Sequence, residues 1–426
     1  MLRTYNYLLL ALLACCLITL RPAQGQTVDS VSTDSGYTQQ VWYNLETGET
    51  WSYNADDWDL AFVASGFGSS IRINGGQGVR VWTYPDGDTA DWATLDTTGM
   101  AQNWPQLHND PADWNLPAFS QGRVPNDAFD QGWGVYDIVT HHVTGDSLYV
   151  IKDVDGNYGK LWIERLASGT YTFRYEVLGS DSTQNFGISK DDYADRFFGY
   201  FSLTDGKARD LEPPKDDWDL LFHKYITFLS PAPGVSIPYG VTGIMLHPNA
   251  RAIELTEVAD PESEPQPDTA QFVTERNVIG YDWKNFIFQE RRYEIEDSLV
   301  YFVEASDGNV FRFIPTGFGG SANGTYYFNV EKTSTVTGQP ELAFDQVKPV
   351  AYPNPVVDGS LYIGGLEQNS GINTYQIHDV QGRQLQQGSL RGGKTNRINV
   401  SELPQGLYLL QMQSGNKVHT TRIQVQ

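Results

Sequence analysis

Short runs in which apolar and polar residues alternate make up most of this chain, and such runs predict β-strands. The segments Ser147 to Ile151 and Lys160 to Ile163 flank Asp155-Gly156, which predicts a β-hairpin closed by a type I′ turn. The same pattern returns around Asp307-Gly308. No long segment has the 3.6-residue period of an amphipathic helix. The pattern therefore predicts an all-β protein.

Two blocks of this pattern occur twice. Trp58-Asp59-Leu60-Ala61-Phe62 returns 160 residues later as Trp218-Asp219-Leu220-Leu221-Phe222, and each block follows a Leu-x-x-Gly segment, at Leu45 and at Leu203. The Asp-Gly hairpins follow each block in the same order. Ordered blocks at a near-constant offset predict a duplication. We expect homologous units at 36–180 and 193–332, a linker at 333–348, and a structural repeat core of Trp58, Asp59, Phe62, Trp218, Asp219 and Phe222.

The first 25 residues have the three parts of a secretory signal. Arg3 supplies the positive charge, Leu8 to Leu20 is apolar, and Ala23-Gln24-Gly25 offers a cleavage site. Both cysteines, Cys15 and Cys16, lie inside this segment. Cleavage after Gly25 would leave no cysteine in the mature chain, which excludes disulfides and zinc–thiolate sites. The alternative is a lipoprotein signal that is cut before Cys15.

The charge of the 426-residue chain restricts its partners. The formal net charge is −23, and residues 26–348 hold 48 acidic and 21 basic residues, a net −27. Binding to nucleic acid needs a basic surface, so nucleic acid is not expected as a partner. No internal apolar run reaches 18 residues, so no transmembrane segment is expected in the mature protein.

The composition changes from residue 349. Ala351-Tyr352-Pro353-Asn354-Pro355 opens a module that continues through Ile377-x-Asp379-x-x-Gly382 and Leu403-Pro-x-Gly406-Leu-Tyr408 to a final strand. Residues 349–426 resemble the C-terminal sorting domain of the type IX secretion system of Bacteroidota. The resemblance implies a small immunoglobulin-like β-sandwich, handling by the type IX machinery, and release outside the cell or anchoring on its surface.

The repeats resemble a second family. Trp58-Asp59-Leu60-x-Phe62, followed by Ile71-x-Ile73-Asn74-Gly75-Gly76, and the later Asp-Gly hairpin are similar to the HmuY family of haem-binding proteins. The second copy lacks the Asn-Gly-Gly segment. The resemblance implies a haemophore-like protein for haem and iron acquisition, with haem as its cofactor. It also implies a haem-donor protein or an outer-membrane receptor as a further partner.

Haemophores of this family hold the iron between two side chains, His or Met. In the first repeat the candidates are His108 with His141 or His142, and Met100 in place of His108. In the second repeat they are His247 and Met245, whereas His223 directly follows the Trp-Asp core and has a structural position. The alternative is that these are surface or strand-packing residues. Arg72, Arg80 and Arg123 offer positive charge for the haem propionates.

Other motifs with catalytic or metal-binding residue types have simpler explanations. Asp153-x-Asp155-Gly156-Asn157 resembles a calcium loop, but its glycine comes too early, and a type I′ turn explains it better. Calcium elsewhere in the acidic body stays an alternative that no motif supports. Asp56-Asp57 and Asp216-Asp217 are paired carboxylates of the kind used in glycoside hydrolysis, or they cap a strand entrance. No Gly-x-Ser-x-Gly or His-Glu-x-x-His motif is present. We therefore expect no enzyme, and the alternative to haem binding is a non-catalytic adhesive or glycan-binding β-protein.

Overall fold

The computed structural model describes residues 27–334, apart from 67, 86 and 126. It also describes 350–425, apart from 357–358, 365–372, 380–382, 392–395 and 415–416. The predicted signal (1–25) and all but two residues of the predicted linker lie outside these ranges. The all-β class is confirmed, because β-strands dominate and the described residues hold a single α-helix, α2 (Met100–Asn103). None of the described helices is long and apolar enough to cross a membrane.

The first large core is built from one continuous stretch of chain, residues 55–211, which we call unit A. One sheet has the order β15-β14-β4-β5, and the other runs β13-β12-β11-β10-β6-β7, with β9 beside β11 and β8 beside β9. The core lies between them, where Phe62 of β4 stacks on Phe173 of β12 with ring centroids 5.1 Å apart. The strands are β4 (Leu60–Val63), β5 (Ile71–Ile73), β6 (Arg80–Thr83), β7 (Gln106–Leu107), β8 (Gly134–Asp137), β9 (His142–Gly145), β10 (Tyr149–Lys152), β11 (Tyr158–Ala167), β12 (Thr170–Val177), β13 (Gln184–Ser189), β14 (Phe198–Ser202) and β15 (Lys207–Arg209).

The second large core combines two stretches of chain, residues 27–54 and 212–334, which we call unit B. Its sheets have the orders β1-β23-β22-β21-β18 and β17-β16-β2-β3, with a separate pair β19-β20. Phe222 of β16 stacks on Phe328 of β23 in this core, at 5.6 Å. The strands are β1 (Thr27–Ser32), β2 (Gln39–Tyr43), β3 (Thr50–Asn54), β16 (Leu220–Ala232), β17 (Val235–Leu246), β18 (Arg251–Leu255), β19 (Lys284–Ile287), β20 (Arg292–Ile295), β21 (Val300–Glu304), β22 (Val310–Phe318) and β23 (Thr325–Ser334).

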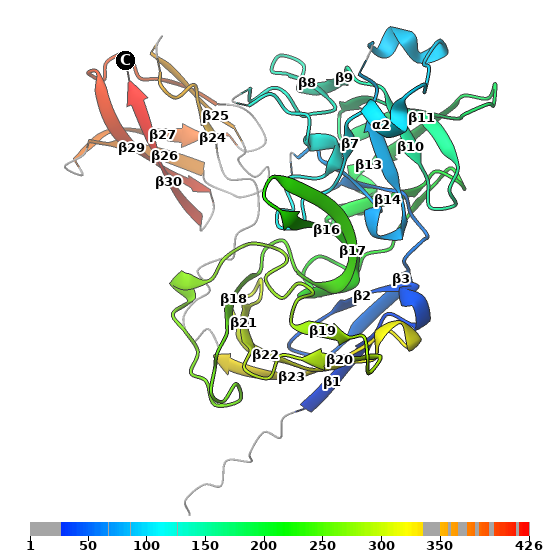
Figure 1. Cartoon of the computed structure of the whole chain (residues 1–426). Helices are drawn as coiled ribbons and strands as arrows, with labels where there is room; N and C mark the ends of the chain where they lie inside the picture. Colours follow the sequence, from blue (N-terminus) through cyan, green and yellow to red (C-terminus); the bar gives the residue numbers. More distant parts are fainter. Residues whose placement is uncertain are drawn as a thin grey trace, which may run out of the picture.

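The two units exchange strands relative to the sequence repeats. The strands that lead into the first Trp-Asp block are β1 to β3, and they pair with β23 and β16 of unit B. Their counterparts β13 to β15 lead into the second block, and they pair with β12 and β4 of unit A. Figure 1 shows the blue β1 beside the later strand β23, with which it pairs. The predicted repeats describe sequence similarity, whereas each core is assembled across the repeat boundary.

The aspartates of the two Trp-Asp blocks hold the exchanged strands. Asp59 Oδ2 accepts a hydrogen bond from Leu203 N at 2.7 Å, and Asp219 Oδ2 accepts one from Leu45 N at 2.8 Å. Both carboxyl groups are buried, and burial raises the pKa of each to about 6. Trp58 and Trp218 lie in an aromatic cluster between the units. The repeated block therefore anchors a hairpin that belongs to the other repeat.

The predicted hairpins are present, but the prediction of a type I′ turn was wrong. β10 pairs with β11, and β21 with β22, as the alternation predicted. A type I′ turn needs positive φ at both central residues, whereas only Gly156 has it here (90°). Asp153 O accepts from Gly156 N, and the Asp153 carboxylate accepts from both nitrogens of Asn157. The loop is therefore a three-residue turn whose glycine takes the left-handed conformation.

The tail forms a third, smaller core between two sheets, with orders β24-β25-β28 and β27-β26-β29-β30. Its buried side chains alternate along β26, where Tyr375 and Ile377 point inward. Strands and seven short 3-10 helices complete the described elements: β24 (Val350–Tyr352), β25 (Ser360–Gly364), β26 (Asn373–His378), β27 (Gln384–Leu390), β28 (Asn396–Asn399), β29 (Gly406–Ser414), β30 (Lys417–Val425), and the 3-10 helices Ser35–Tyr37, Gly75–Gln77, Thr89–Ala93, Ala118–Ser120, Lys190–Tyr193, Thr269–Gln271 and Gly320–Ala322.

Candidate functional site

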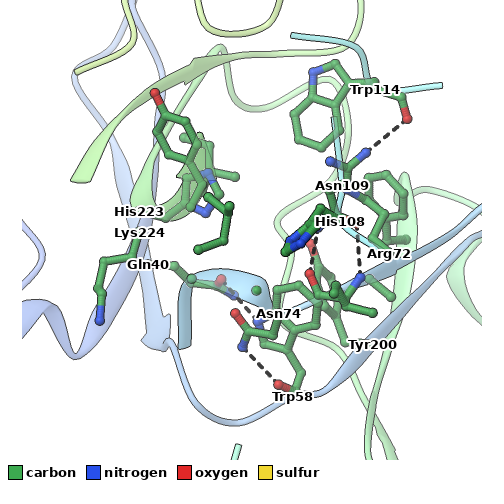
Figure 2. A pocket seen from close by; sticks show the side chains of 18 of the residues that line it. Gln40, Trp58, Arg72, Asn74, His108, Asn109, Trp114, Tyr200, His223 and Lys224 are labelled. Carbon is green, nitrogen blue, oxygen red and sulfur yellow. Dashed lines mark hydrogen bonds between the residues drawn. The ribbon is translucent and has the colours of Figure 1, made fainter. Parts of the chain in front are cut away.

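A cavity lies at the junction of units A and B, and both contribute to its walls. It is an open pocket, and the space between its atoms amounts to about 660 Å³ when the open solvent at its opening is counted. Figure 2 shows His223 and Lys224 of β16 on one side and His108, Arg72 and Trp114 on the other. Its described lining contains no aspartate or glutamate, although the chain carries a net −23. Further lining residues are Gln40, Trp58, Ala61, Ile73, Asn74, Gly75, Gly76, Asn109, Phe198, Tyr200, Leu221, Tyr225, Ile226 and Arg276.

Two arginines in this junction cavity are buried without an ionic partner. Arg72 of β5 is 4% exposed and Arg276, which precedes β19, is 3% exposed. Their guanidinium carbons lie 4.7 and 4.2 Å from the ring centroid of Trp114. Within the described residues neither forms a salt bridge. Burial lowers the pKa of both groups, and repulsion from Arg276 lowers that of Arg72 further. The carboxylates of Asp110 and Asp113 act in the opposite direction on both arginines, although neither forms a salt bridge with them.

The polar atoms around these arginines also lack partners. Arg72 donates from Nη1 to Trp114 O at 3.0 Å, which leaves its Nη2 unpaired. Nε and Nη1 of Arg276 have no hydrogen-bond partner in the described structure, nor do the Nε2 atoms of Gln40 and His223. A buried donor without an acceptor costs about 1–3 kcal/mol, and more when it is charged. The cavity is therefore organised to receive hydrogen-bond acceptors.

The arginine at position 72 departs from the symmetry of the repeats. Ala61 pairs with Arg72 across β4 and β5, and the equivalent Leu221 pairs with Met245 across β16 and β17. Asn74 N and His247 N likewise bond to the equivalent Asp59 O and Asp219 O. The first repeat thus places a cation at a buried position where the second repeat has a methionine. A buried cation is expected to lower stability relative to a methionine at the same position. A residue present despite such a cost is typical of a binding site.

Aromatic side chains form the walls of the cavity and are held by a buried carboxyl group. Trp58 meets Tyr200 edge to face at 5.1 Å. Behind this wall, the carboxyl of Glu212 accepts hydrogen bonds from Phe197 N and Phe198 N at 3.1 Å and from Tyr200 OH at 3.4 Å. Burial raises the pKa of Glu212 to about 8, against the lowering effect of those hydrogen bonds and of Arg196. Glu212 therefore positions two wall residues, Phe198 and Tyr200.

We expect this carboxyl group to make stability depend on pH. Folded Glu212 keeps its proton up to about pH 8, whereas the unfolded chain releases it near its ordinary value of 4.5. The folded state thus binds the extra proton, and its contribution to stability is lost as the pH rises from about 5 to 8. In Glu212→Gln this loss should disappear. We therefore expect the free energy of unfolding, measured with denaturant at pH 6 and 8, to fall more steeply with pH in the wild type than in Glu212→Gln. The difference between the two slopes should be up to about 1.4 kcal/mol per pH unit.

The matched control for this prediction is Glu49→Gln, which alters an exposed loop. Comparing variant with wild type cancels the contributions of the buried histidines and lysines. Equal pH slopes for wild type and Glu212→Gln would show that Glu212 is ionised in the folded protein.

The structure brings one predicted haem ligand to this cavity and places the others elsewhere. His108 follows β7, lines the cavity and meets Phe228 edge to face at 5.5 Å. His141 lies on the β8–β9 turn with a positive φ of 59°, and its Nδ1 is 2.7 Å from Tyr136 OH. His142 begins β9, where its Nδ1 accepts from Arg165. Neither His141 nor His142 belongs to the cavity lining.

The remaining candidates are packed within the fold. Met100 begins α2 and packs against Trp82, Trp104 and Val150. Met245 is fully buried between the units. Nε2 of His247 donates to Lys215 O and its Nδ1 accepts from Asn249 N, so both ring nitrogens are engaged. Within the described residues, no group of three or more His, Cys, Asp or Glu side chains could hold a metal ion.

The sequence did not predict that Arg72 and Arg276 lie in the same cavity, and His223 was expected to have only a structural role. A signal for Arg72 does exist, since Ile71-Arg72-Ile73-Asn74 matches Ile244-Met245-Leu246-His247 once the two hairpins are superimposed. Arg276 has no such signal. Arg276 becomes part of the cavity because the segment 109–118 of unit A reaches unit B. There, Trp114 Nε1 donates to Leu246 O and Arg276 N donates to Ala112 O.

Comparison with known proteins identifies the tail. Residues 350–426 match the family model described as the secretion system C-terminal sorting domain, which confirms the prediction for this segment. No curated protein matches the chain. The resemblance of the repeats to haem-binding proteins therefore stays a prediction. By its tail, the protein is a cargo of the type IX secretion system, exported to the cell surface or the extracellular space.

Proposed function

We propose that the exported body is a non-catalytic binding protein, which takes a small acidic ligand into the junction cavity. The observation that carries this proposal is the pair Arg72 and Arg276, buried on one cavity without a salt bridge. The guanidinium group stays charged near neutral pH. A carboxylate or another oxyanion between the two groups would relieve their repulsion and supply the missing acceptors.

The charge distribution supports a local site over a general attraction to anions. The body as a whole carries a net −27, which repels anions at long range. The cavity lining, in contrast, combines Arg72, Arg276 and Lys224 with no carboxylate. An acidic ligand is therefore expected to bind tightly only where its charge enters the cavity.

The first test is a titration of the mature protein with acetate, benzoate, sulfate and phosphate, followed by calorimetry and thermal unfolding. Acids that enter the cavity should raise the melting temperature, because they bind only the folded state. Benzyl alcohol, an uncharged relative of benzoate, should have no comparable effect. Arg276→Met should weaken the binding of acids at least about 10-fold, since a hydrogen bond to a charged group contributes roughly 1.5–3 kcal/mol.

The Arg209→Met variant is the control for Arg276→Met, because the half-buried Arg209 pairs with Asp205 outside the cavity lining. If none of the four anions raises the melting temperature, the proposal fails.

Haem binding for iron acquisition is the second candidate, and one observation favours it. His108 from the first repeat and His223 from the second line the same cavity, and Nε2 of His223 is unpaired. Imidazole is an axial ligand of haem iron, and the two arginines would suit the propionates. Hemin titration should then give a sharp Soret band with resolved α and β bands, lost in His223→Ala. A spectrum equal to that of free hemin would remove this candidate.

A further inference from the structure

The junction cavity has two chemically different ends. At its closed end lie the guanidinium groups of Arg72 and Arg276 against Trp114. At its mouth lie His108, Lys224 and Ile226, all half-buried. The mouth has one cation, the half-buried Lys224, whereas the closed end has two buried guanidinium groups, so we expect the acidic group of a ligand at the closed end.

The walls between these ends are suited to a ring and less to a bare oxyanion. Trp58, Tyr200 and Tyr225 are aromatic and buried, and each carries one polar atom at its edge. Nε1 of Trp58 already donates to Gln40 Oε1, whereas the hydroxyl of Tyr225 is unpaired. Sulfate or phosphate has no apolar face to set against such walls. A sugar ring has an apolar face and polar groups, since its C–H face packs on aromatic rings and its hydroxyls reach the polar edges.

A long two-stranded ribbon, β16–β17, continues outward from the mouth. Lys224, Ile226 and Phe228 alternate along β16 and therefore share one face. Phe228 is 39% exposed, and its ring meets that of His108 at the mouth. Pro238 and Gly240 lie opposite Phe228 and Ile226 across the ribbon, where the glycine leaves open surface. Figure 1 shows this ribbon curving away from unit B. The ribbon face extends the cavity as an exposed platform.

The charge of the body limits what the platform can hold. A polymer with an acid on every residue would be repelled by the net −27 of residues 26–348. A neutral chain with a single acid at its end meets the two arginines without this penalty. Beyond Lys224 at the mouth, the platform residues Ile226, Phe228 and Pro238 carry no charge.

We infer that the ligand is the terminal sugar acid of an otherwise neutral glycan, with its carboxylate between Arg72 and Arg276 and the following sugars over Phe228. This inference rests on the proposed acid-binding function and specifies its ligand class. It also specifies the glycan-binding alternative of the sequence analysis.

The test compares free sugar acids with the same acids at the end of neutral oligosaccharides. Glucuronic acid and N-acetylneuraminic acid are titrated into the mature protein beside aldotriouronic acid and 3′-sialyllactose. Xylobiose, lactose and trigalacturonic acid complete the series. At least one oligosaccharide with a single acid should bind about 10-fold more tightly than its free acid. Xylobiose and lactose should not bind measurably, and trigalacturonic acid should bind more weakly than aldotriouronic acid.

Two alanine variants locate the extra affinity. Phe228→Ala should lower affinity for the preferred oligosaccharide about 3- to 10-fold and leave that of the free acid unchanged. Phe288→Ala is the matched control, because Phe288 is 79% exposed just after β19 and is not part of the cavity lining. It should change neither affinity.

The outcomes separate this inference from the proposed function. If benzoate or sulfate binds through Arg276 but no sugar acid does, the glycan inference falls and acid binding stands. Equal affinity for free acid and oligosaccharide, or no effect of Phe228→Ala, also overturns it. If no anion binds, both fall together.

Discussion

Arg72→Met should make the ligand-free protein more stable while it weakens acid binding. The substitution gives the first repeat the residue that the second repeat carries at the equivalent, fully buried Met245. It removes a buried charge without an ionic partner, and apolar replacement of buried charged groups has stabilised proteins by about 1–4 kcal/mol. The repulsion between Arg72 and Arg276 ends as well. Denaturant unfolding without ligand measures this gain.

The same variant should bind acids about 10- to 100-fold more weakly, since it loses a charged donor. Arg209→Met again serves as the control, and should change the unfolding free energy by no more than about 1 kcal/mol, because Arg209 forms a partly exposed ion pair. A destabilised Arg72→Met protein would mean that the contacts of Arg72 with Trp114 already satisfy its charge. The cation would then serve the fold and not a ligand.

A fragment of residues 55–211 should fold by itself, whereas a fragment of residues 36–180 should not. The first contains every strand of unit A and all the buried residues of its core, from Leu60 to Leu203. The second follows the sequence repeat and lacks β13, β14 and β15, and with them Ile188 and Phe201 of that core. It also carries β2 and β3 without their partner β16.

Cooperative thermal unfolding and near-ultraviolet circular dichroism would distinguish the fragments. We expect a single sharp transition for 55–211 and none for 36–180, because losing several large core side chains costs about 3–5 kcal/mol each. Residues 55–211 expose Trp58 and Phe198, which pack between the units in the whole chain, so both fragments are compared at low concentration. A folded 36–180 fragment would show that the repeat, and not the exchanged unit, is the autonomous element.

The local fold was predictable because the strand period and turn glycines act over short distances. Alternation and Asp155-Gly156 sufficed for the β10–β11 hairpin, and the tail was recognised from Pro353-Asn354-Pro355 onward. The exchange of strands was not predictable. Leu45 N donates to Asp219, 174 residues away. Both repeats carry the same Leu-x-x-Gly and Trp-Asp motifs, so the sequence does not show which copy of one motif contacts which copy of the other.

The site was predictable only in part, for a related reason. Chemistry-bearing residue types such as His108 can be listed from the sequence, and His108 does line the cavity. The cavity itself depends on long-range packing, because Arg276 reaches Trp114 only when the two units meet. An arginine that replaces the counterpart of Met245 is visible in the sequence once the hairpins are aligned.

The pairing of β1 with β23 also sets the order in which the protein can be completed during synthesis. Ser32 bonds to Asn323, 291 residues further along, so β1 must wait for β23 to be synthesised before it can pair. Contacts so distant along the chain form slowly. Unit A, whose chain is continuous, is complete much earlier. The newly made chain therefore passes through a stage with one finished core and an unpaired leading sheet, β2–β3, whose exposed edge needs protection from other chains.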